Sequence, residues 1–186
     1  MEKTKVGIIV GSARKGAFSQ KVADIMASYL KEQFDVRFLK ISNLDLFNQD
    51  YDEENAVPAT WVDFRKEVLK MDAYLFVTPE YNRSVPPVLK NALDIASRPY
   101  GQNNWSAKPA AVVSISPGAN GGFGANHHLR QTLCFLNIYT MQQPEAYLGN
   151  IMDSLDQEGN LTNDRTVSFL KNVAESFADW IAKFVK

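Results

Sequence analysis

The sequence predicts an α/β fold in which helices cover both faces of a parallel sheet. Short runs of β-branched and other apolar residues, such as residues 6–10, are typical of strands buried on both sides. Between these runs, apolar residues recur every three to four positions, as they do on one face of a helix. Because strand and helix signals alternate along the whole chain, the connections must cross over and the strands must be parallel.

The composition is that of a globular protein with one full domain. The chain has 186 residues, of which 45% are hydrophobic and 22% are charged, close to the averages for globular domains. The net charge of −1 argues against a nucleic-acid-binding surface and against a basic membrane-binding surface. No apolar run approaches the ~20 residues that span a bilayer, and no signal-peptide core precedes the first strand. We therefore predict a single domain over residues 1–186, in the cytoplasm, that binds neither nucleic acid nor membranes.

Cysteine and metal chemistry have little support in the sequence. The single cysteine, Cys134, excludes an internal disulfide. Its apolar neighbours Leu133, Phe135 and Leu136 predict a buried, unreactive thiol. No cluster of His, Cys and Asp has the spacing of metal ligands, so we predict no metal site.

The first half of the chain contains three of the strands. We expect strands at 6–10, 35–41 and 72–78, a helix at about 19–33 with Ser19 or Phe18 near its cap, and a helix capped by Thr60. Residues 42–58 form a long acidic and aromatic loop. A loop of this length in a compact domain is usually a rim, a lid or an interface.

The second half contains two strands and three helices. Pro86 and Pro87 begin a helix, because proline is tolerated in a first helical turn. We expect strands at 109–116 and 138–141, and a helix between them that ends near Asn137. Residues 142–160 form an extension, and a strongly amphipathic last helix begins at Thr162.

Five parallel strands between helices make a three-layer αβα sandwich. In the flavodoxin-like strand order 2-1-3-4-5, the first, third and fourth strands are neighbours, and ligands bind beyond their carboxyl ends. Three unusual loops follow these strands, at 11–17, 79–84 and 117–122. We therefore expect the three loops to meet in one crevice.

The first loop has the features of a phosphate site. It combines two glycines, hydroxyl side chains and Arg14 at the start of a helix, where backbone N–H groups attract anions. It is not a P-loop, because Ala17 and Phe18 stand where Lys and Ser/Thr would be, and it lacks the Gly-x-Gly-x-x-Gly pattern of dinucleotide-binding sites. A plain connecting loop with a solvated Arg14 is the alternative.

The other two loops suit a flat ring. The second, residues 79–82, offers a rigid turn, an aromatic side chain and an amide. The third, residues 116–122, offers glycines that allow close backbone approach and free N–H groups at a helix start. A phosphate, a flat ring and a hydrogen-bonding ring edge together describe flavin mononucleotide (FMN).

With these motifs the sequence resembles the NAD(P)H-dependent FMN reductases, a flavodoxin-like family that includes quinone, azo-dye and chromate reductases. The resemblance covers roughly residues 5 to 150. The matching segments are Gly11-Ser12-x-Arg14-x4-Ser19, Pro79-Glu80-Tyr81-Asn82 with the following Leu89-Lys90-Asn91, and Ser116-x-Gly118-x2-Gly121-Gly122. The second segment is the most specific of the three.

The resemblance implies bound FMN, NADPH or NADH as co-substrate, and a homodimer or homotetramer. It implies that the phosphate is held by Gly11, Ser12, Arg14, Ser19 and Gln20, that the ring is lined by Pro79, Glu80, Tyr81 and Asn82, and that the other ring edge meets Ser116 and Gly118. Pro87 and Gly124 depart from the residues that many relatives have there, and His127 and His128 follow closely. The choice of donor and the oligomeric state therefore stay open.

The expected activity is ping-pong hydride transfer from NAD(P)H, through FMN, to a small-molecule electron acceptor such as a quinone, a flavin or an azo compound. The flavin carries the chemistry, so we nominate no catalytic side chain. The alternatives are an electron carrier of the flavodoxin type without its own NAD(P)H turnover, and a relative that has lost its flavin. Glu80 is equally well explained as a solvated carboxylate, and His127 and His128 as surface residues.

Overall fold

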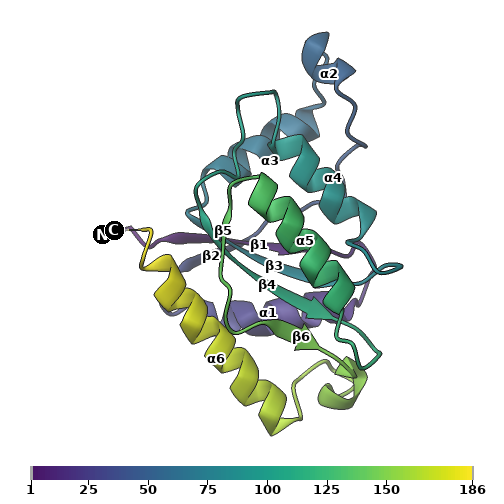
Figure 1. Ribbon diagram of the computed structural model, residues 1–186, viewed down its shortest axis with the longest axis vertical. Helices are drawn as coiled ribbons and strands as arrows, with labels where there is room; N and C mark the ends of the chain where they lie inside the picture. Colours follow the sequence, from purple (N-terminus) through teal and green to yellow (C-terminus); the bar gives the residue numbers. More distant parts are fainter. Residues whose placement is uncertain (1, 186) are drawn as a thin grey trace.

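The computed structural model describes residues 2–185 and shows one sheet between two helical layers (Figure 1). The strands are β1 (Lys5–Val10), β2 (Asp35–Phe38), β3 (Ala73–Pro79), β4 (Pro109–Ile115), β5 (Tyr139–Thr140) and β6 (Ala146–Leu148). The helices are α1 (Phe18–Leu30), α2 (Asp50–Glu53), α3 (Ala59–Leu69), α4 (Pro87–Ala96), α5 (Phe123–Phe135), the 3₁₀ helix η1 (Ile151–Ser154) and α6 (Asp164–Ile181). The predicted three-layer αβα architecture is confirmed.

The strand order is β2-β1-β3-β4-β5, with every pair parallel. This is the predicted flavodoxin-like order. Val10 of β1 pairs with Val77 of β3, and Pro79 of β3 pairs with Ile115 of β4. The carboxyl ends of these three strands therefore lie side by side, which brings their loops to one edge of the sheet.

The outer strand beside β4 is divided into two, which the sequence analysis missed. β5 pairs with the beginning of β4, at Pro109 and Ala110, whereas β6 pairs with its end. We expected one strand at 138–141 and an irregular extension after it. Pro144 lacks a backbone N–H, and two glutamines precede it, so this segment leaves the sheet before residue 146 returns to it.

Each helical layer buries its own hydrophobic core against the sheet. α1 and α6 cover one face and α3, α4 and α5 cover the other (Figure 1). The α1–α6 core contains Met26 and Phe177, while the other core contains Trp61 and Trp105, and all four side chains are fully buried. Buried apolar side chains are the main source of the fold's stability.

Several predicted boundaries and one burial assignment are wrong. β2 ends at Phe38 rather than at residue 41, and Thr60 lies inside α3, whose N-cap residue is Pro58. α1 ends at Leu30 rather than at residue 33, and α6 begins at Asp164, two residues after the predicted start. Cys134 is exposed, because it lies on the solvent side of α5 while Leu133 points into the core.

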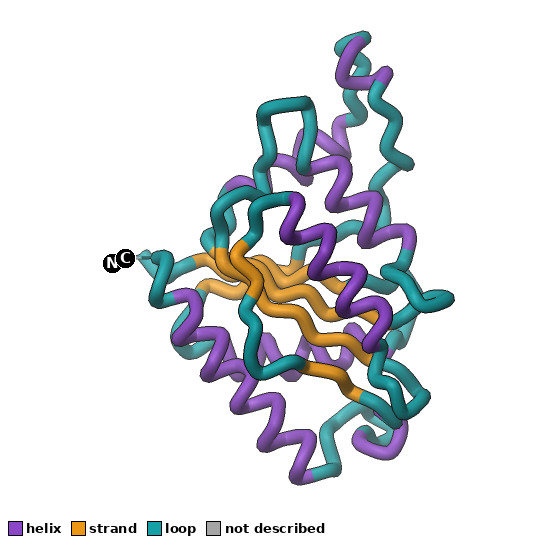
Figure 2. Tube along the Cα trace, in the orientation of Figure 1, coloured by secondary structure: helices purple, strands orange, loops and turns teal. Residues whose placement is uncertain are grey.

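The long loop at 42–58 contains the short helix α2 and projects beyond the sheet (Figure 2). A nearly buried ion pair fastens it to α3, since both terminal nitrogens of Arg65 donate to the carboxylate of Asp52, at 2.7 and 2.8 Å. Phe47 stacks on Trp61 with 5.6 Å between ring centroids. The loop is thus packed onto α3 along its base.

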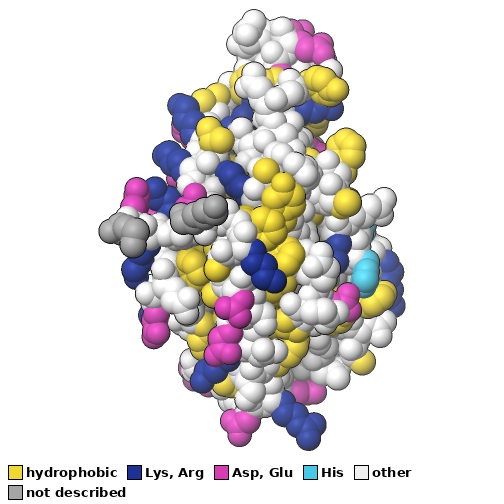
Figure 3. Space-filling view, turned by 60° about the vertical axis from the view of Figure 1, so that its left-hand side comes forward, with side chains coloured by type: hydrophobic (Ala, Val, Ile, Leu, Met, Phe, Trp, Pro, Cys, Tyr) yellow, Lys and Arg dark blue, Asp and Glu magenta, His cyan; other side chains and the backbone are white. Residues whose placement is uncertain are grey.

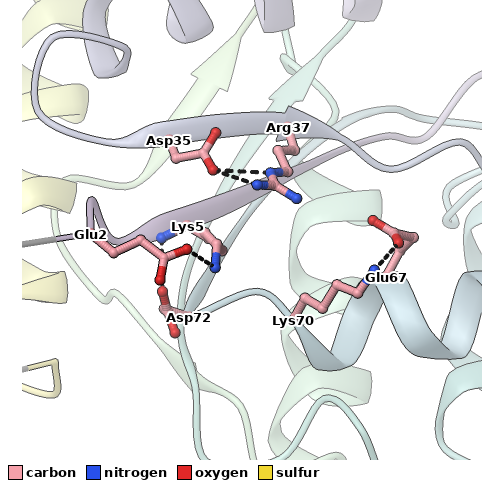
Figure 4. Close-up of polar contacts among 7 residues, drawn as sticks. All are labelled: Glu2, Lys5, Asp35, Arg37, Glu67, Lys70 and Asp72. Atoms are coloured by element: carbon pink, nitrogen blue, oxygen red, sulfur yellow. Dashed lines mark hydrogen bonds and ion pairs between the residues drawn. The ribbon is translucent and has the colours of Figure 1, made fainter.

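Charged pairs gather at the opposite edge of the sheet, where the strands begin (Figure 4). The backbone N–H of Lys5 donates to Asp72 at 2.8 Å, and Arg37 forms an ion pair with Asp35 at 2.7 Å. Exposed ion pairs such as that of Arg37 and Asp35 contribute only about 0–1 kcal/mol each. These pairs lie at the amino-terminal edge of the sheet, opposite the three loops.

Lys108 ties β4 to the end of α3. Its ammonium group donates to the carbonyl oxygens of Val68 and Leu69, at 3.1 and 3.0 Å, and to the hydroxyl of Tyr74 at 3.1 Å. Burial lowers the pKa of Lys108 to about 8 and raises the pKa of Tyr74 above its ordinary value. The pKa of a lysine in the unfolded chain is about 10.4. Between pH about 8 and about 10, Lys108 has therefore lost a proton in the folded chain that it keeps in the unfolded chain.

We therefore expect Lys108 to make the protein more stable as the pH rises from about 8 to about 10, because the unfolded state binds more protons in that interval. The check is urea unfolding across this range for the natural chain and for Lys108→Met. The unfolding free energy of the natural chain minus that of Lys108→Met should increase with pH. A difference that shrinks would contradict the assignment.

The surface carries charges of both signs. On the face shown in Figure 3, Lys and Arg side chains are interspersed with Asp and Glu and with apolar side chains. That face has no continuous basic surface of the kind that binds nucleic acid. None of the helices within residues 2–185 is both long enough and apolar enough to cross a membrane.

Candidate functional site

The first loop is packed closely against the end of β3. The N–H of Gly11 donates to the carbonyl of Val77 at 2.8 Å, and a Cβ added to Gly11 would lie 2.6 Å from the hydroxyl of Thr78. The N–H of Arg14 donates to the hydroxyl of Ser12 at 3.2 Å, which makes a tight turn. Arg14 itself is exposed, so its guanidinium is available to a ligand.

The start of α1 has the properties of an anion site. Its N-cap residue is Ala17, and no side chain caps the helix, so the first N–H groups lack the acceptor that a capping residue would supply. The hydroxyl of Ser19, in the first turn, is buried and has no hydrogen-bond partner within residues 2–185. A buried polar group without a partner costs about 1–3 kcal/mol, a cost that an acceptor from outside the chain would offset.

The second loop forms a tight hairpin. Tyr81 and Ser84 exchange both backbone hydrogen bonds at 3.0 Å, and the two residues between them, Asn82 and Arg83, have φ values of 50° and 66°. Positive φ at both central positions is the geometry of a two-residue hairpin turn. The turn leaves Tyr81 44% exposed beside the first loop.

Glu80 fastens this hairpin to α5. Its carboxylate accepts a hydrogen bond from the backbone N–H of Ala125 at 3.0 Å and forms an ion pair with Arg83 at 3.0 Å. A second contact joins the hydroxyl of Ser84 to Nδ1 of His128 at 2.8 Å. The side chain of Glu80 is only 10% exposed, so its interpretation as a solvated carboxylate is wrong.

Gly124 makes the contact between Glu80 and α5 possible. A Cβ at this position would lie 3.0 Å from both the carbonyl oxygen of Arg83 and the carboxylate of Glu80. A side chain at this position would require these groups to shift by a few tenths of an ångström. Both histidines that follow are exposed on α5, as predicted, and His127 is hydrogen-bonded to the hydroxyl of Tyr147 at 2.9 Å.

The third loop is a glycine turn held against β6. Gly121 and Gly122 have φ values of 58° and 75°, and a Cβ on Gly121 would lie 2.7 Å from the backbone of Tyr147. The N–H of Gly118 donates to the hydroxyl of Ser116 at 3.1 Å, and the carbonyl of Gly118 accepts from Asn150 at 3.2 Å. Glycine is required here by both the left-handed conformation and the close approach.

The three loops enclose two cavities that share Glu80. The first, of about 210 Å³, is lined by the first loop, the hairpin and the start of the third loop; the predicted residues among its walls are Ser12, Arg14, Ser19, Pro79, Glu80 and Tyr81. The second, of about 410 Å³, lies between the hairpin and the glycine turn; the predicted residues there are Glu80, Asn82, Ser116 and Gly118. The predicted convergence of the loops is therefore seen.

Two predicted residues do not line either cavity, and several lining residues were not predicted, among them two with polar side chains. Gly11 is buried behind the loop, and the amide of Gln20 donates instead to Asp24 along α1, at 2.9 Å. Arg83 and Asn120 line the larger cavity but were not predicted. Arg83 follows Asn82, and both have positive φ in the hairpin turn. This conformation brings Arg83 to the cavity, and it could be recognised only once the hairpin was known.

The residues present fit FMN. The uncapped start of α1, the orphaned hydroxyl of Ser19 and the exposed Arg14 suit a phosphate. The hairpin and the glycine turn bound an adjacent space, where backbone groups and Tyr81 can meet a flat ring. No three His, Cys, Asp or Glu side chains of the described chain are grouped so as to hold a metal ion.

The orphaned hydroxyl leads to a prediction with opposite signs for two quantities. Ser19→Ala should leave the FMN-free protein as stable or up to about 1 kcal/mol more stable, because a buried unsatisfied group is removed. The same change should weaken FMN binding about tenfold, since one hydrogen bond to the phosphate is lost. Urea unfolding and fluorescence titration measure the two effects. Ser28→Ala, on the exposed side of α1, is the control and should change neither.

A flavodoxin-like sheet in which the loops after β1, β3 and β4 enclose two adjoining cavities is the arrangement seen in flavin-nucleotide-binding α/β proteins. The comparison with known families then names the group. A model of the NADPH-dependent FMN reductases matches residues 4–153, and the chain belongs to that family.

Individual relatives agree with this assignment. The chain is 51% identical over 176 residues to a quinone reductase of Pseudomonas putida, covering 95% of this chain and 94% of the relative. It is 40% identical over 177 residues to a 2-hydroxy-1,4-benzoquinone reductase of a Burkholderia species, with 95% and 96% covered. Among solved structures it is similar to FerB, a flavoenzyme NAD(P)H:(acceptor) oxidoreductase from Paracoccus denitrificans, with a TM-score of 0.90 and 35% identity over 97% of this chain and 98% of that one.

Proposed function

We propose that the protein is an FMN-dependent NAD(P)H oxidoreductase that reduces quinones. The observation that carries the proposal is the buried, unpartnered hydroxyl of Ser19 at the uncapped start of α1, beside a cavity lined by Arg14 and Tyr81. Membership of the FMN reductase family and the names of the quinone-reducing relatives support it.

In this proposal each loop has one task. Ser12, Arg14, Ser19 and the N–H groups of α1 hold the phosphate. Pro79, Tyr81 and Asn82 border the ring, while Glu80 keeps their hairpin against α5. Ser116, Gly118 and the glycine turn present backbone groups to the ring edge where negative charge develops on reduction.

Bound FMN would supply the redox chemistry, the transfer of a hydride from NADPH or NADH to the acceptor in a ping-pong sequence. The protein's own residues bind and orient the two partners in turn. The exposed position of Tyr81 and the open cavity beside it leave room for one flat substrate to replace another. No side chain is assigned a covalent or acid–base step.

The test compares FMN with riboflavin, which lacks the phosphate. The proposal expects FMN to bind at least ~100-fold more tightly, because a phosphate with several charge-assisted hydrogen bonds contributes several kcal/mol. It also expects quinone-dependent oxidation of NADPH or NADH with the parallel double-reciprocal plots of a ping-pong sequence. Tight FMN binding with no turnover would instead identify an electron carrier.

We propose that residues 1–186 act as one FMN-binding domain and that the protein works in the cytoplasm. We also propose that it is a homodimer or homotetramer. The contact surface would include a groove of about 740 Å³ between α4 and α5, where Phe135 is 89% and Tyr100 is 91% exposed. Exposed aromatic side chains beside a groove are typical of subunit interfaces.

A further inference from the structure

Of the described residues that line the larger cavity, Arg83 alone is positively charged. The proposed function gives a task to three other residues of this cavity, Glu80, Asn82 and Ser116, but none to Arg83. Its guanidinium stands at an open wall beside the ring site. A cation at such a place is expected to attract a negatively charged ligand.

The ion pair of Arg83 and Glu80 is arranged with the cation outward. The side chain of Arg83 is 71% exposed and that of Glu80 only 10%, with 3.0 Å between Nη1 of Arg83 and Oε1 of Glu80. The other carboxylate oxygen, Oε2, accepts from the backbone N–H of Ala125 at 3.0 Å. Both oxygens of the carboxylate are thus engaged, and the charge that this wall presents to a ligand is positive.

Most of the hydrogen-bond donors of the Arg83 guanidinium are free. A guanidinium has several N–H groups in one plane, and the bond to Glu80 is the only side-chain hydrogen bond of Arg83 among residues 2–185. A planar group with free donors suits a phosphate, which it binds through two parallel hydrogen bonds. The pair with Glu80 also restricts the side chain beforehand, which reduces the entropy lost when a ligand binds.

The backbone at Arg83 would favour a different residue. In a two-residue hairpin turn with positive φ at both central positions, an Asn is most often followed by a glycine. Here Asn82 is followed by Arg83, at φ 66°, where glycine would fit without strain. A long side chain held on a strained backbone beside a cavity points to a function for that side chain.

The ligand that brings phosphate groups to this wall is the nicotinamide nucleotide. Its nicotinamide must reach the flavin ring between the hairpin and the glycine turn. The ring itself takes up part of the cavity of about 410 Å³, so the remainder of the dinucleotide must extend across the rim, where Arg83 lies. A quinone without an acidic group carries no charge and would gain little from the guanidinium.

We propose that Arg83 binds a phosphate group of NADPH or NADH, and that it thereby determines how well the protein uses its electron donor but not how well it uses an uncharged quinone. This inference rests on the proposed function. The pyrophosphate is common to both nucleotides, whereas the 2′-phosphate occurs only in NADPH. A comparison of the two nucleotides therefore identifies which phosphate Arg83 binds.

The first test measures binding without turnover. NADP⁺ and NAD⁺, which cannot reduce FMN, are titrated into the FMN-loaded protein in a calorimeter. Arg83→Met should raise the dissociation constant of NADP⁺ about tenfold, because one charge-assisted pair with a phosphate is lost. Arg83→Lys keeps the charge but not the planar donors and should raise it about threefold. An equal effect on NAD⁺ assigns the pyrophosphate, and an effect on NADP⁺ alone assigns the 2′-phosphate.

The second test uses steady-state kinetics, because in a ping-pong sequence the kcat/KM of each substrate reports its own half-reaction. Arg83→Met should lower kcat/KM for NADPH about tenfold. The kcat/KM for an uncharged benzoquinone and the dissociation constant of FMN should stay within about twofold of the natural values. A merely structural effect, a displaced hairpin, would change all three quantities.

Arg37→Met is the matched control. Arg37 is also an exposed arginine in an ion pair, at 2.7 Å from Asp35, but it lines neither of the two loop cavities. This variant should bind both nucleotides as the natural chain does. Arg83→Gly suits the positive φ and decides the question if Arg83→Met does not fold.

Unchanged nucleotide binding in Arg83→Met, or equal losses of kcat/KM for donor and quinone, would overturn the inference, and the proposed function would stand. Failure of the natural, FMN-loaded chain to oxidise either NADPH or NADH would overturn both.

Discussion

Arg14→Met is expected to raise the dissociation constant for FMN roughly fiftyfold, because a charge-assisted pair with the phosphate is lost. Arg14 is exposed and lines the smaller cavity, so the change removes no internal contact that the fold needs. The unfolding free energy of the FMN-free protein should therefore stay within about 0.5 kcal/mol of the natural value. Fluorescence titration and urea unfolding measure the two quantities.

Lys15→Met is the matched control for this variant. It removes the same charge from the neighbouring residue of the same loop, but Lys15 does not line the cavity. FMN affinity should therefore change less than about threefold, through the general field alone. Equal losses in the two variants would show that the loop acts only through its net charge, and would remove Arg14 from the phosphate site.

Gly121→Ala is expected to destabilise the protein by about 3–5 kcal/mol and to abolish measurable binding of the flavin ring. Two causes add. At φ +58° an alanine is strained, and its Cβ would lie 2.7 Å from the backbone of Tyr147 and 2.9 Å from that of Leu148. Because backbone atoms cannot turn aside, either β6 or the glycine turn must move.

Gly101→Ala separates the two causes. Gly101 has φ +84°, and a Cβ added there meets nothing within 4 Å, so this variant carries the strain without the clash. It should cost only about 1–2 kcal/mol and leave FMN affinity unchanged. If Gly121→Ala is no more destabilising than Gly101→Ala, the close packing of the turn on β6 does not hold it in place.

The alternation of buried strands and amphipathic helices was enough to predict the layers and the strand order. Apolar runs such as residues 73–77 are long and uniform, so their burial on both faces follows from the residues alone. The three glycine- and proline-marked loops were also placed correctly, because parallel strands bring their carboxyl ends to one edge.

Features that depend on distant partners could not be read in the same way. β6 has only three residues, and its pairing with the end of β4 is decided by the path of the chain around Pro144. The burial of Glu80 depends on Gly124 and Ala125, forty-four and forty-five residues later in the chain.

Asn126 carried a local signal that the sequence analysis did not use. It stands beside the buried face of α5, between Ala125 and Leu129, and a polar residue there needs a partner inside the protein. That partner, Ser114, belongs to β4 and could be identified only from the fold.

The most direct measurement of the central claim is the visible spectrum of the FMN-supplemented protein, recorded without oxygen while NADPH or NADH and then a quinone are added. The account predicts that the flavin bands remain with the protein after desalting, bleach rapidly when one of the nucleotides is added, and return with the quinone. A protein that retains no flavin would contradict the assignment of Arg14, Tyr81 and Gly118 to an FMN site. Bound flavin that is reduced by neither NADPH nor NADH would contradict the proposed oxidoreductase activity.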